Sequence, residues 1–245
     1  MTTTSLYVSS AGADARLKQL EMVANNLANA DTDGFRADAA SFGRALTANL
    51  ESADAERSLG LHVFVNTQGP GVRHVSGPVT RTGGDLDVAI DGPGFFSVQT
   101  PAGVRYTRAG GFQVDPAGQL ISTAGHPVLG DGGPINVGPG AARIDADGQI
   151  VSATGGVLGR VAVDLFEDPS QLSKAGENLF EAPPLARRQP AGVRNLVPGS
   201  VETSNVKPMQ ELAHLVVLQR AFDASMEALQ ADDAASNRLI QEMNR

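Results

Sequence analysis

The stretch VKPMQELAHLVVLQRAFDASMEALQADDAASNRLIQEMNR, residues 206–245, decides the fold. It contains no Gly and no Pro after Pro208. Its apolar residues are separated by steps of three and four, or by sums of them, a period near 3.5 that predicts a helix with an apolar seam; they are Leu212, Leu215, Phe222, Met226, Leu229, Ile240 and Met243. Pro208 is tolerated in a first helical turn, and Asn205 is the candidate N-cap. At 1.5 Å per residue such a helix is roughly 55 Å long, which exceeds one small globular core.

The seam of this helix is interrupted by polar residues. Gln219, Asp233 and Ser236 occupy seam positions, which disfavours an isolated two-stranded coiled coil. Packing among several neighbouring helices, with polar groups pairing between them, tolerates such residues better. Phe222 is predicted to lie in the seam between helices. Arg220 has two open interpretations, a solvated side chain or a partner for an acidic group of an adjacent subunit.

A second helix is predicted at the other end of the chain. Between residues 5 and 29 the apolar positions again follow steps of three and four: Leu6, Ala13, Leu17, Leu20, Ala24 and Leu27. Asn25, Asn26 and Asn29 then signal its end, because Asn favours caps and turns over helix interiors. These amides either cap the helix locally or bond to neighbouring helices in an assembly. We expect the two terminal helices to pair as a coiled coil.

The region between the helices changes to a period of two, which is typical of strands. DLDVAI (85–90) alternates, FFSVQT (95–100) and VRYTR (104–108) flank a PAG turn, and 157–168 is one further long strand. QVDPAGQLISTAG (113–125) and RIDADGQIVSATG (143–155) form a weak internal repeat of strand, Asp-containing turn and strand. We therefore predict an α+β protein, with terminal coiled-coil helices and a central, mostly antiparallel β domain of eight to ten short strands.

These patterns divide the chain into five parts. They are an N-terminal coiled-coil helix at 1–30, a linker at 31–75, the β domain at 76–184, a return linker at 185–205 and a C-terminal coiled-coil helix at 206–245. Within the first linker, 42–60 permits a short helix and LHVFV (61–65) reads as a strand.

Composition excludes several classes of function. The net charge is −8, from 19 basic and 27 acidic residues, so the chain lacks the basic footprint of a nucleic-acid or anionic-membrane binder. It has no apolar run near 18 residues that predicts a membrane span. Its first residues lack the features of a cleaved Sec signal peptide. It has no cysteine, which excludes disulfides and thiolate metal sites.

Three stretches resemble one known family. NNLANADTDGF (25–35), residues 85–130 and residues 201–230, which carry SNV and QRAF, occur in the order typical of bacterial flagellar basal-body rod and hook proteins. The length and FRAD (35–38) are most similar to the proximal-rod, F-type subunits of that family; the distal-rod, G-type subunits are the alternative. The resemblance covers nearly the whole chain.

The resemblance implies a structural subunit and no catalytic activity. Its helices would line a hollow shaft that transmits torque and passes exported proteins, and its β domain would lie outside. Its partners would be copies of itself, the neighbouring proximal- and distal-rod proteins and the flagellar type III export apparatus. It would reach the periplasm-spanning rod without a cleaved signal peptide. The implied assembly residues are Leu17, Leu20, Asn25, Asn26, Leu27, Asn29, Gly34, Phe35, Ser204, Asn205, Leu212, Leu215, Gln219, Arg220, Phe222, Met226 and Leu229.

A different class of function remains as the alternative. A secreted β-domain enzyme or carbohydrate binder, oligomerised by its helices, would need convergent polar groups in residues 76–184. The sequence offers no catalytic set there and no Trp to stack on a sugar. The four histidines, His62, His74, His126 and His214, lack paired spacing, so we expect them to be structural or solvated and expect no metal and no cofactor.

Overall fold

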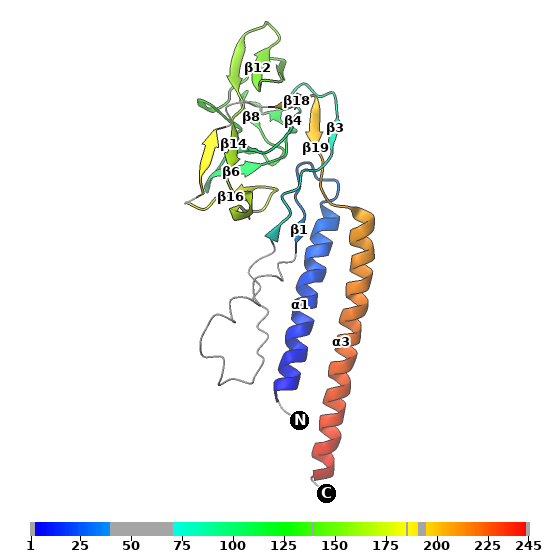
Figure 1. Ribbon diagram of the computed structural model, residues 1–245. Coiled ribbons are helices and arrows are strands. Elements are labelled where there is room, and N and C mark those ends of the chain that lie inside the picture. Colours follow the sequence, from blue (N-terminus) through cyan, green and yellow to red (C-terminus); the bar gives the residue numbers. More distant parts are fainter. Residues whose placement is uncertain (1–2, 40–70, 139, 185, 191–194, 244–245) are drawn as a thin grey trace. The chain divides into compact units, whose positions relative to one another are not determined.

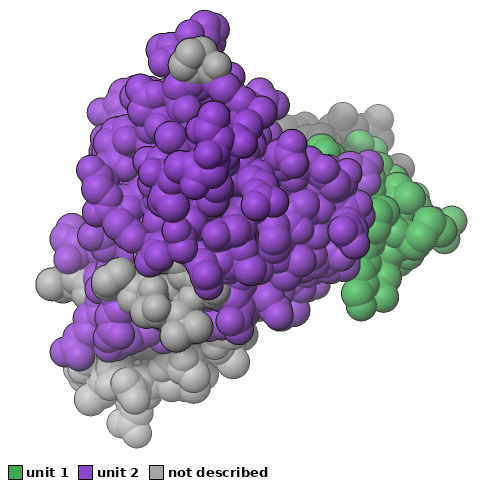
Figure 2. All heavy atoms as spheres, turned by 90° about the horizontal axis from the view of Figure 1, so that it is seen from above, with its two compact units in different colours: residues 1–28, 38–71, 207–245 green, residues 29–37, 72–206 purple. Residues whose placement is uncertain are grey.

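A computed structural model describes residues 3–39, 71–138, 140–184, 186–190 and 195–243 of the chain (Figure 1). The predicted short helix at 42–60, the strand at 61–65 and His62 lie outside these residues. The chain forms two compact units (Figure 2). The first comprises residues 1–28, 38–71 and 207–245, and the second comprises residues 29–37 and 72–206.

The first unit consists mainly of two long helices that lie side by side, α1 (Thr3–Ala28) and α3 (Pro208–Met243). Val23 of α1 and Leu218 of α3 are buried. The Arg16 guanidinium of α1 donates a hydrogen bond to the Ser225 hydroxyl of α3. Two short strands, β1 (Asp38–Ala39) and β2 (Gly71–Val72), pair with each other where the chain passes between units.

The buried positions of the helix pair coincide only in part with the predicted seams, of which Leu20, Leu27, Leu215 and Phe222 are half-buried. Leu17, Leu212 and Met226 were assigned to seams, yet their side chains are 45%, 43% and 38% exposed, whereas Val23 and Leu218 were not assigned and are buried. The reason is that each helix carries apolar residues on more than one face. A count of three- and four-residue steps finds a periodic row, but it does not select which of two rows a neighbouring helix covers.

The start of α3 also differs from the prediction. Asn205 does not cap it, because its side chain bonds to backbone groups of residues 37, 73 and 75. The helix instead begins at Pro208, and the Lys207 carbonyl accepts from the N–H groups of Gln210 and Glu211. The proline occupies the first turn as expected, where its missing N–H costs no hydrogen bond.

The second unit is built of short antiparallel strands. Six of them form the largest sheet, in the order β15 (Ser173–Lys174), β16 (Phe180–Glu181), β6 (Gly103–Thr107), β5 (Phe95–Thr100), β14 (Val163–Phe166) and β17 (Arg188–Pro190). A three-stranded sheet contains β11 (Ala142–Ile144), β12 (Gln149–Ser152) and β13 (Val157–Arg160). The remaining strands form pairs: β3 (Val79–Arg81) with β19 (Ser200–Glu202), β4 (Val88–Ile90) with β18 (Leu196–Pro198), β7 (Gln113–Val114) with β8 (Leu120–Ile121), and β9 (Leu129–Gly130) with β10 (Gly133–Pro134). One short 3₁₀ turn, η1 (Pro169–Gln171), precedes β15.

The internal repeat is confirmed as two equivalent hairpins. In the first, the Gln119 N–H donates to the Asp115 carboxylate at 2.7 Å, and Gly118 has a φ of 82°. In the second, the Gln149 N–H donates to the Asp145 carboxylate at 2.8 Å, and Gly148 has a φ of 75°. Each Asp therefore stabilises its own turn.

Two segments differ from their predicted form. The single long strand predicted over 157–168 is two strands in different sheets, β13 and β14, because the chain changes sheets at Val161, which is fully buried. Residues 188–202, expected in an irregular return linker, contain β17, β18 and β19, which pair with β14, β4 and β3. Strands β3 to β16 alone exceed the number predicted, since many are only two residues long.

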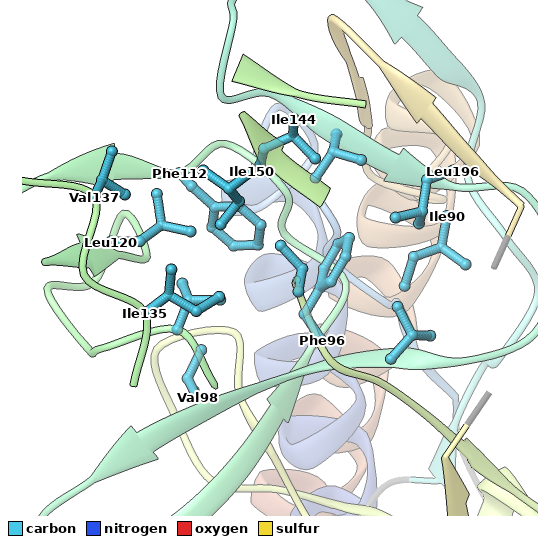
Figure 3. Close-up of a cluster of buried hydrophobic side chains, with 14 of the residues drawn as sticks. Ile90, Phe96, Val98, Phe112, Leu120, Ile135, Val137, Ile144, Ile150 and Leu196 are labelled. Carbon is cyan, nitrogen blue, oxygen red and sulfur yellow. The ribbon is translucent and has the colours of Figure 1, made fainter. Parts of the chain in front are cut away.

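The core of this unit lies on both faces of β5. Phe96 and Val98 belong to a large cluster that includes Phe112, Leu120 and Ile150 (Figure 3). Phe95, on the opposite face because neighbouring side chains of a strand alternate, packs with four other buried side chains: Tyr106, Phe166, Leu172 and Phe180. Burying one such ring contributes about 1.5–3 kcal/mol.

Candidate functional site: a buried junction and an exposed helix surface

A tight turn brings residues 31–37 onto the β unit. Gly34 has a φ of 68°, and a Cβ there would lie 2.3 Å from the Ala109 backbone nitrogen, so a side chain is excluded on two grounds. The Gly34 N–H donates to the Glu202 carbonyl at 2.6 Å. The Asn178 side-chain amide donates to the Asp33 carbonyl at 2.6 Å. This turn is therefore held by β19 and by the loop that precedes β16.

A buried ionic group follows directly. The Glu202 carboxylate accepts from Arg36 at 2.8 Å and from Arg108 at 3.2 Å, and all three side chains are at most 4% exposed. The Gly77 N–H donates to the same carboxylate at 2.8 Å. Arg108 also donates to the carbonyls of Ile90 and Gly92.

Burial lowers the pKa of both arginines. Desolvation lowers the pKa of Arg108 to about 10, opposed by the attraction of Glu202 and assisted by repulsion from Arg36. Desolvation likewise lowers the pKa of Arg36 while Glu202 raises it. Both guanidinium groups are charged at neutral pH, so one buried carboxylate holds two buried cations.

Asn205 hydrogen-bonds the segment at 203–206 to two other parts of the chain. Its Oδ1 accepts from the Ala37 N–H at 2.7 Å. Its Nδ2 donates to the carbonyls of Arg73 at 2.9 Å and Val75 at 2.7 Å. Three separate chain segments are thereby joined by one side chain. The Ser204 hydroxyl accepts from the Val206 N–H at 3.2 Å and stabilises the local turn.

Phe35 adds an apolar contact to these polar ones. Its buried ring packs with Ala37 and Val206, and the Lys174 ammonium lies 4.0 Å from the ring centroid. We call the combined set the junction, consisting of Gly34, Phe35, Arg36, Arg108, Glu202 and Asn205. Within the second unit it fixes both the segment at 29–37 and the segment at 203–206.

The asparagines that end α1 bond within the chain. The Asn26 side chain is 1% exposed, accepts from the Asp38 N–H at 2.7 Å and donates to the Asp38 carbonyl at 3.0 Å. Asn25 donates to the Asp38 carboxylate at 2.8 Å. Asn29 accepts from the Thr32 hydroxyl at 3.2 Å. Asn29 therefore closes a local turn, whereas Asn25 and Asn26 bind Asp38, which lies 13 and 12 residues further along the chain. Bonds from these amides to neighbouring helices in an assembly stay a prediction.

An exposed apolar surface covers α3. Met209, Val216 and Val217 are 79%, 46% and 62% exposed, and Leu212 and Met226 are 43% and 38% exposed. We call these five residues the α3 surface. Leu20, Leu27, Leu215 and Phe222 are half-buried, Gln219 and Arg220 are exposed, and the side chain of Leu229 lies outside the described part of the helix.

The sequence reasoning therefore found only part of the junction. It singled out Gly34, Phe35 and Asn205, and Ser204 beside them, through their motifs, but it missed Arg36, Arg108 and Glu202. The available signal was a charged residue inside an apolar context, as in GFRAD (34–38) and SVET (200–203). A charge in such a position requires a partner, but the sequence does not say which one.

The contacts of the junction stabilise the fold of the second unit. In the part of the chain that the structure describes, no three His, Cys, Asp or Glu side chains gather as a metal site. His126 contacts Glu177 at 2.8 Å, and His214 is exposed. No described helix is both long enough and apolar enough to span a membrane.

Three segments of the chain match known protein families. Residues 6–36 match the family described as flagella basal body rod protein. Residues 89–157 match the D1 domain of flagellar hook protein FlgE/F/G, and residues 197–242 match the C-terminal region of flagellar basal body rod FlgEFG protein.

Individual relatives span nearly the whole chain. The flagellar basal-body rod protein FlgF of Caulobacter vibrioides is 37% identical over 226 residues, which cover 90% of this chain and 89% of the relative. FlgG of Buchnera aphidicola is 34% identical, covering 97% of this chain and 98% of the relative. FlgF of Salmonella typhimurium is 31% identical, covering 97% of each chain.

Proposed function

This chain belongs to the flagellar basal-body rod protein family, and from that premise we propose that it is a proximal-rod subunit that polymerises through its terminal helices. The polymer is a hollow drive shaft that transmits torque and through which flagellar proteins are exported. The role is mechanical, and we assign no catalytic activity or cofactor to the chain.

The observation that carries this proposal is the exposed α3 surface. Five large apolar side chains lie on one helix with 38–79% of their area accessible. Each fully buried valine, leucine or methionine contributes about 1.5–3 kcal/mol. Covering this surface with helices of neighbouring subunits therefore supplies a strong driving force for assembly.

The junction supplies the second mechanical requirement. A shaft that carries torque needs subunits whose chain segments do not slide against their β unit. Arg36, Glu202 and Asn205 hold the segments at 29–37 and 200–206 through buried ionic and hydrogen bonds. Interiors of this kind are close-packed and resist deformation. These contacts support the proposal that the junction makes the subunit stiff.

The subunit type rests on local sequence. FRAD at 35–38 and the length of 245 residues favour the proximal, F-type subunit. Relatives of both types match the chain, so the distal, G-type subunit is the alternative. In either case successive subunits contact each other head-to-tail with helical symmetry, because an extending tube cannot be closed by two-fold contacts.

The partners and location follow from this assignment. The neighbours are copies of the chain and the adjoining rod proteins, in the basal body. We propose delivery by the flagellar type III export apparatus without a cleaved signal. The absence of cysteine suits a chain that crosses unfolded into an oxidising compartment.

Deleting the gene from its own bacterium and imaging purified basal bodies tests the assignment. Because a shaft grows outward from its base, loss of a proximal subunit is expected to remove every part that stands on it. A stub of rod that remains in the deletion strain supports the distal alternative. Complete rods of normal length, with normal swimming, contradict a rod function.

A further inference from the structure

His74 lies in a segment that two junction residues, Arg36 and Asn205, bind through its backbone. Its ring centroid lies 6.5 Å from that of Phe95 and 6.1 Å from that of Phe180. Both imidazole nitrogens are buried, and neither has a hydrogen-bond partner among the residues that the structure describes. The neutral ring thus acts as an apolar side chain, at the cost of one donor and one acceptor left unsatisfied.

The backbone on either side of His74 is hydrogen-bonded to Ala37 and to the junction residues Arg36 and Asn205. The Arg73 N–H donates to the Ala37 carbonyl at 2.8 Å, and Asn205 donates to the carbonyls of Arg73 and Val75. Arg36 donates to the Val75 carbonyl and, at 3.4 Å, to the Ser76 hydroxyl. Displacing residue 74 therefore displaces the acceptors of both Asn205 and Arg36.

The charges around the ring are predominantly positive. Arg36, Arg108 and Lys174 all repel a protonated His74, and Asp168 attracts it. The Asp168 carboxylate is exposed and already accepts from Ser170 at 3.0 Å. The buried Glu202 is engaged by both arginines. A fourth cation in this position would have two N–H donors without acceptors and no buried anion of its own.

We propose that His74 is a pH-sensitive latch, which holds residues 73–76 in the junction while its ring is neutral and releases them when the ring is protonated. Release removes the Asn205 and Arg36 contacts with this segment. The β5–β6 hairpin keeps its backbone pairing, since none of its ladder bonds involves residues 73–76. The proposal stands on the geometry of the ring and does not depend on rod assembly.

The direction of the pH effect follows from linkage. Burial, followed by repulsion from Arg36, lowers the pKa of His74. The open or unfolded chain therefore takes up the proton first as the pH falls, so closure is complete above the ordinary histidine pKa of about 6.5 and weakens below it. For a ring that stays neutral when closed, lowering the pH from 7.5 to 5.5 increases the opening equilibrium constant about tenfold.

Hydrogen–deuterium exchange of the full chain at pH 7.5 and 5.5, corrected for intrinsic exchange rates, tests the latch. We expect opening of residues 73–77 to increase about tenfold at pH 5.5, while residues 95–107 keep their protection. His74→Phe should abolish the difference between the two pH values. His126→Gln, which changes a partly exposed histidine paired with Glu177, should leave it unchanged.

Equal protection of residues 73–77 at both pH values overturns the proposal, as does an unchanged pH response in His74→Phe. Should His74→Phe fail to fold, an NMR titration of the wild-type imidazole decides. The latch requires that proton uptake by His74 coincide with loss of protection at residues 73–77. Protonation of His74 near the ordinary histidine pKa, while residues 73–77 keep full protection from exchange, would refute the latch.

Discussion

At the scale of single residues, the junction is an example of buried charge that is tolerated only because it is fully paired. Replacing a buried ion group with apolar residues is often neutral, but removing one partner leaves an uncompensated charge. Among the residues that the structure describes, Glu202 is the carboxylate that pairs with both Arg36 and Arg108. The stability of the second unit should therefore depend more on Glu202 than on any exposed acid.

Glu202→Gln is expected to destabilise the protein by about 3–5 kcal/mol, because two guanidinium groups lose their anion. Chemical denaturation followed by far-UV circular dichroism measures the change. Glu181→Gln is the matched control, since Glu181 is 51% exposed and pairs with Arg105 at 3.2 Å; its cost should stay below about 1 kcal/mol. Equal costs for the two variants would show that the buried group contributes no special stability.

Gly34→Ala tests the turn that enters the junction. The left-handed backbone alone costs about 1–2 kcal/mol for an L-residue, and the new Cβ would also meet the Ala109 backbone nitrogen at 2.3 Å. Gly125→Ala is the control, because Gly125 has a φ of 83° and nothing lies within 4 Å of its Cβ position. The Gly34 variant should lose clearly more stability in the same denaturation experiment. A difference near zero between the variants would mean that the close approach to Ala109 is readily relieved.

The sequence predicted contacts between residues that are close together in the chain, but it did not predict contacts between residues that are far apart. In the turns at Asp115 and Asp145 each carboxylate accepts from a backbone N–H four residues later, so the repeat was visible in the sequence. Arg36 and Glu202 are 166 positions apart in the sequence and meet only through the fold. The SNV motif pointed to Asn205, but the sequence predicted that Asn205 would cap the C-terminal helix. Its side chain instead accepts from the Ala37 N–H.

At the scale of elements, the two helices show what periodicity does and does not determine. It predicted both helices, whose bounds came out as Thr3–Ala28 and Pro208–Met243. It did not determine the buried face, because α3 has one row through Leu215, Leu218 and Phe222 and a second through Met209, Leu212 and Val216. Only the presence of α1 distinguishes the rows. The second row, together with the exposed Val217 and Met226, makes up the α3 surface that the proposed assembly covers.

Val217→Asp is expected to prevent rod assembly and abolish swimming, because it introduces a charge into a surface that neighbouring helices desolvate. The stability of the isolated chain should change by less than about 0.5 kcal/mol, since the side chain is exposed there. Val157→Asp on β13 is the matched control: both valines are 62% exposed. Swimming assays and denaturation of the purified chains measure the two effects. Normal swimming with Val217→Asp would argue against helix-mediated polymerisation.

At the scale of the whole molecule, the two units differ in how much apolar surface they bury. The second unit contains the large cluster around Phe96 and the ring cluster around Phe95. In the first, among side chains that the structure describes, the buried large apolar residues are Val23 and Leu218. Helices in proteins gain most of their stability from packing, so the helices should open more readily than the β unit.

Limited proteolysis of the purified chain, with mass spectrometry of the products, measures this difference. We expect early cleavage in residues 1–28 and 207–245 and a resistant product that contains residues 72–206. The chain as a whole then gains helix stability only on assembly, when folding and association are coupled. Resistance of both terminal segments equal to that of residues 72–206 would indicate a self-sufficient helix pair.

The central claim is that neighbouring subunits cover the α3 surface in the assembled rod. Because the chain has no cysteine, a single Val217→Cys substitution in a swimming strain gives one reactive thiol. Its maleimide labelling is compared between the purified chain and intact basal bodies. We expect rapid labelling of the purified chain, in which this position is exposed, and strong protection in basal bodies. Equally rapid labelling in both would contradict it.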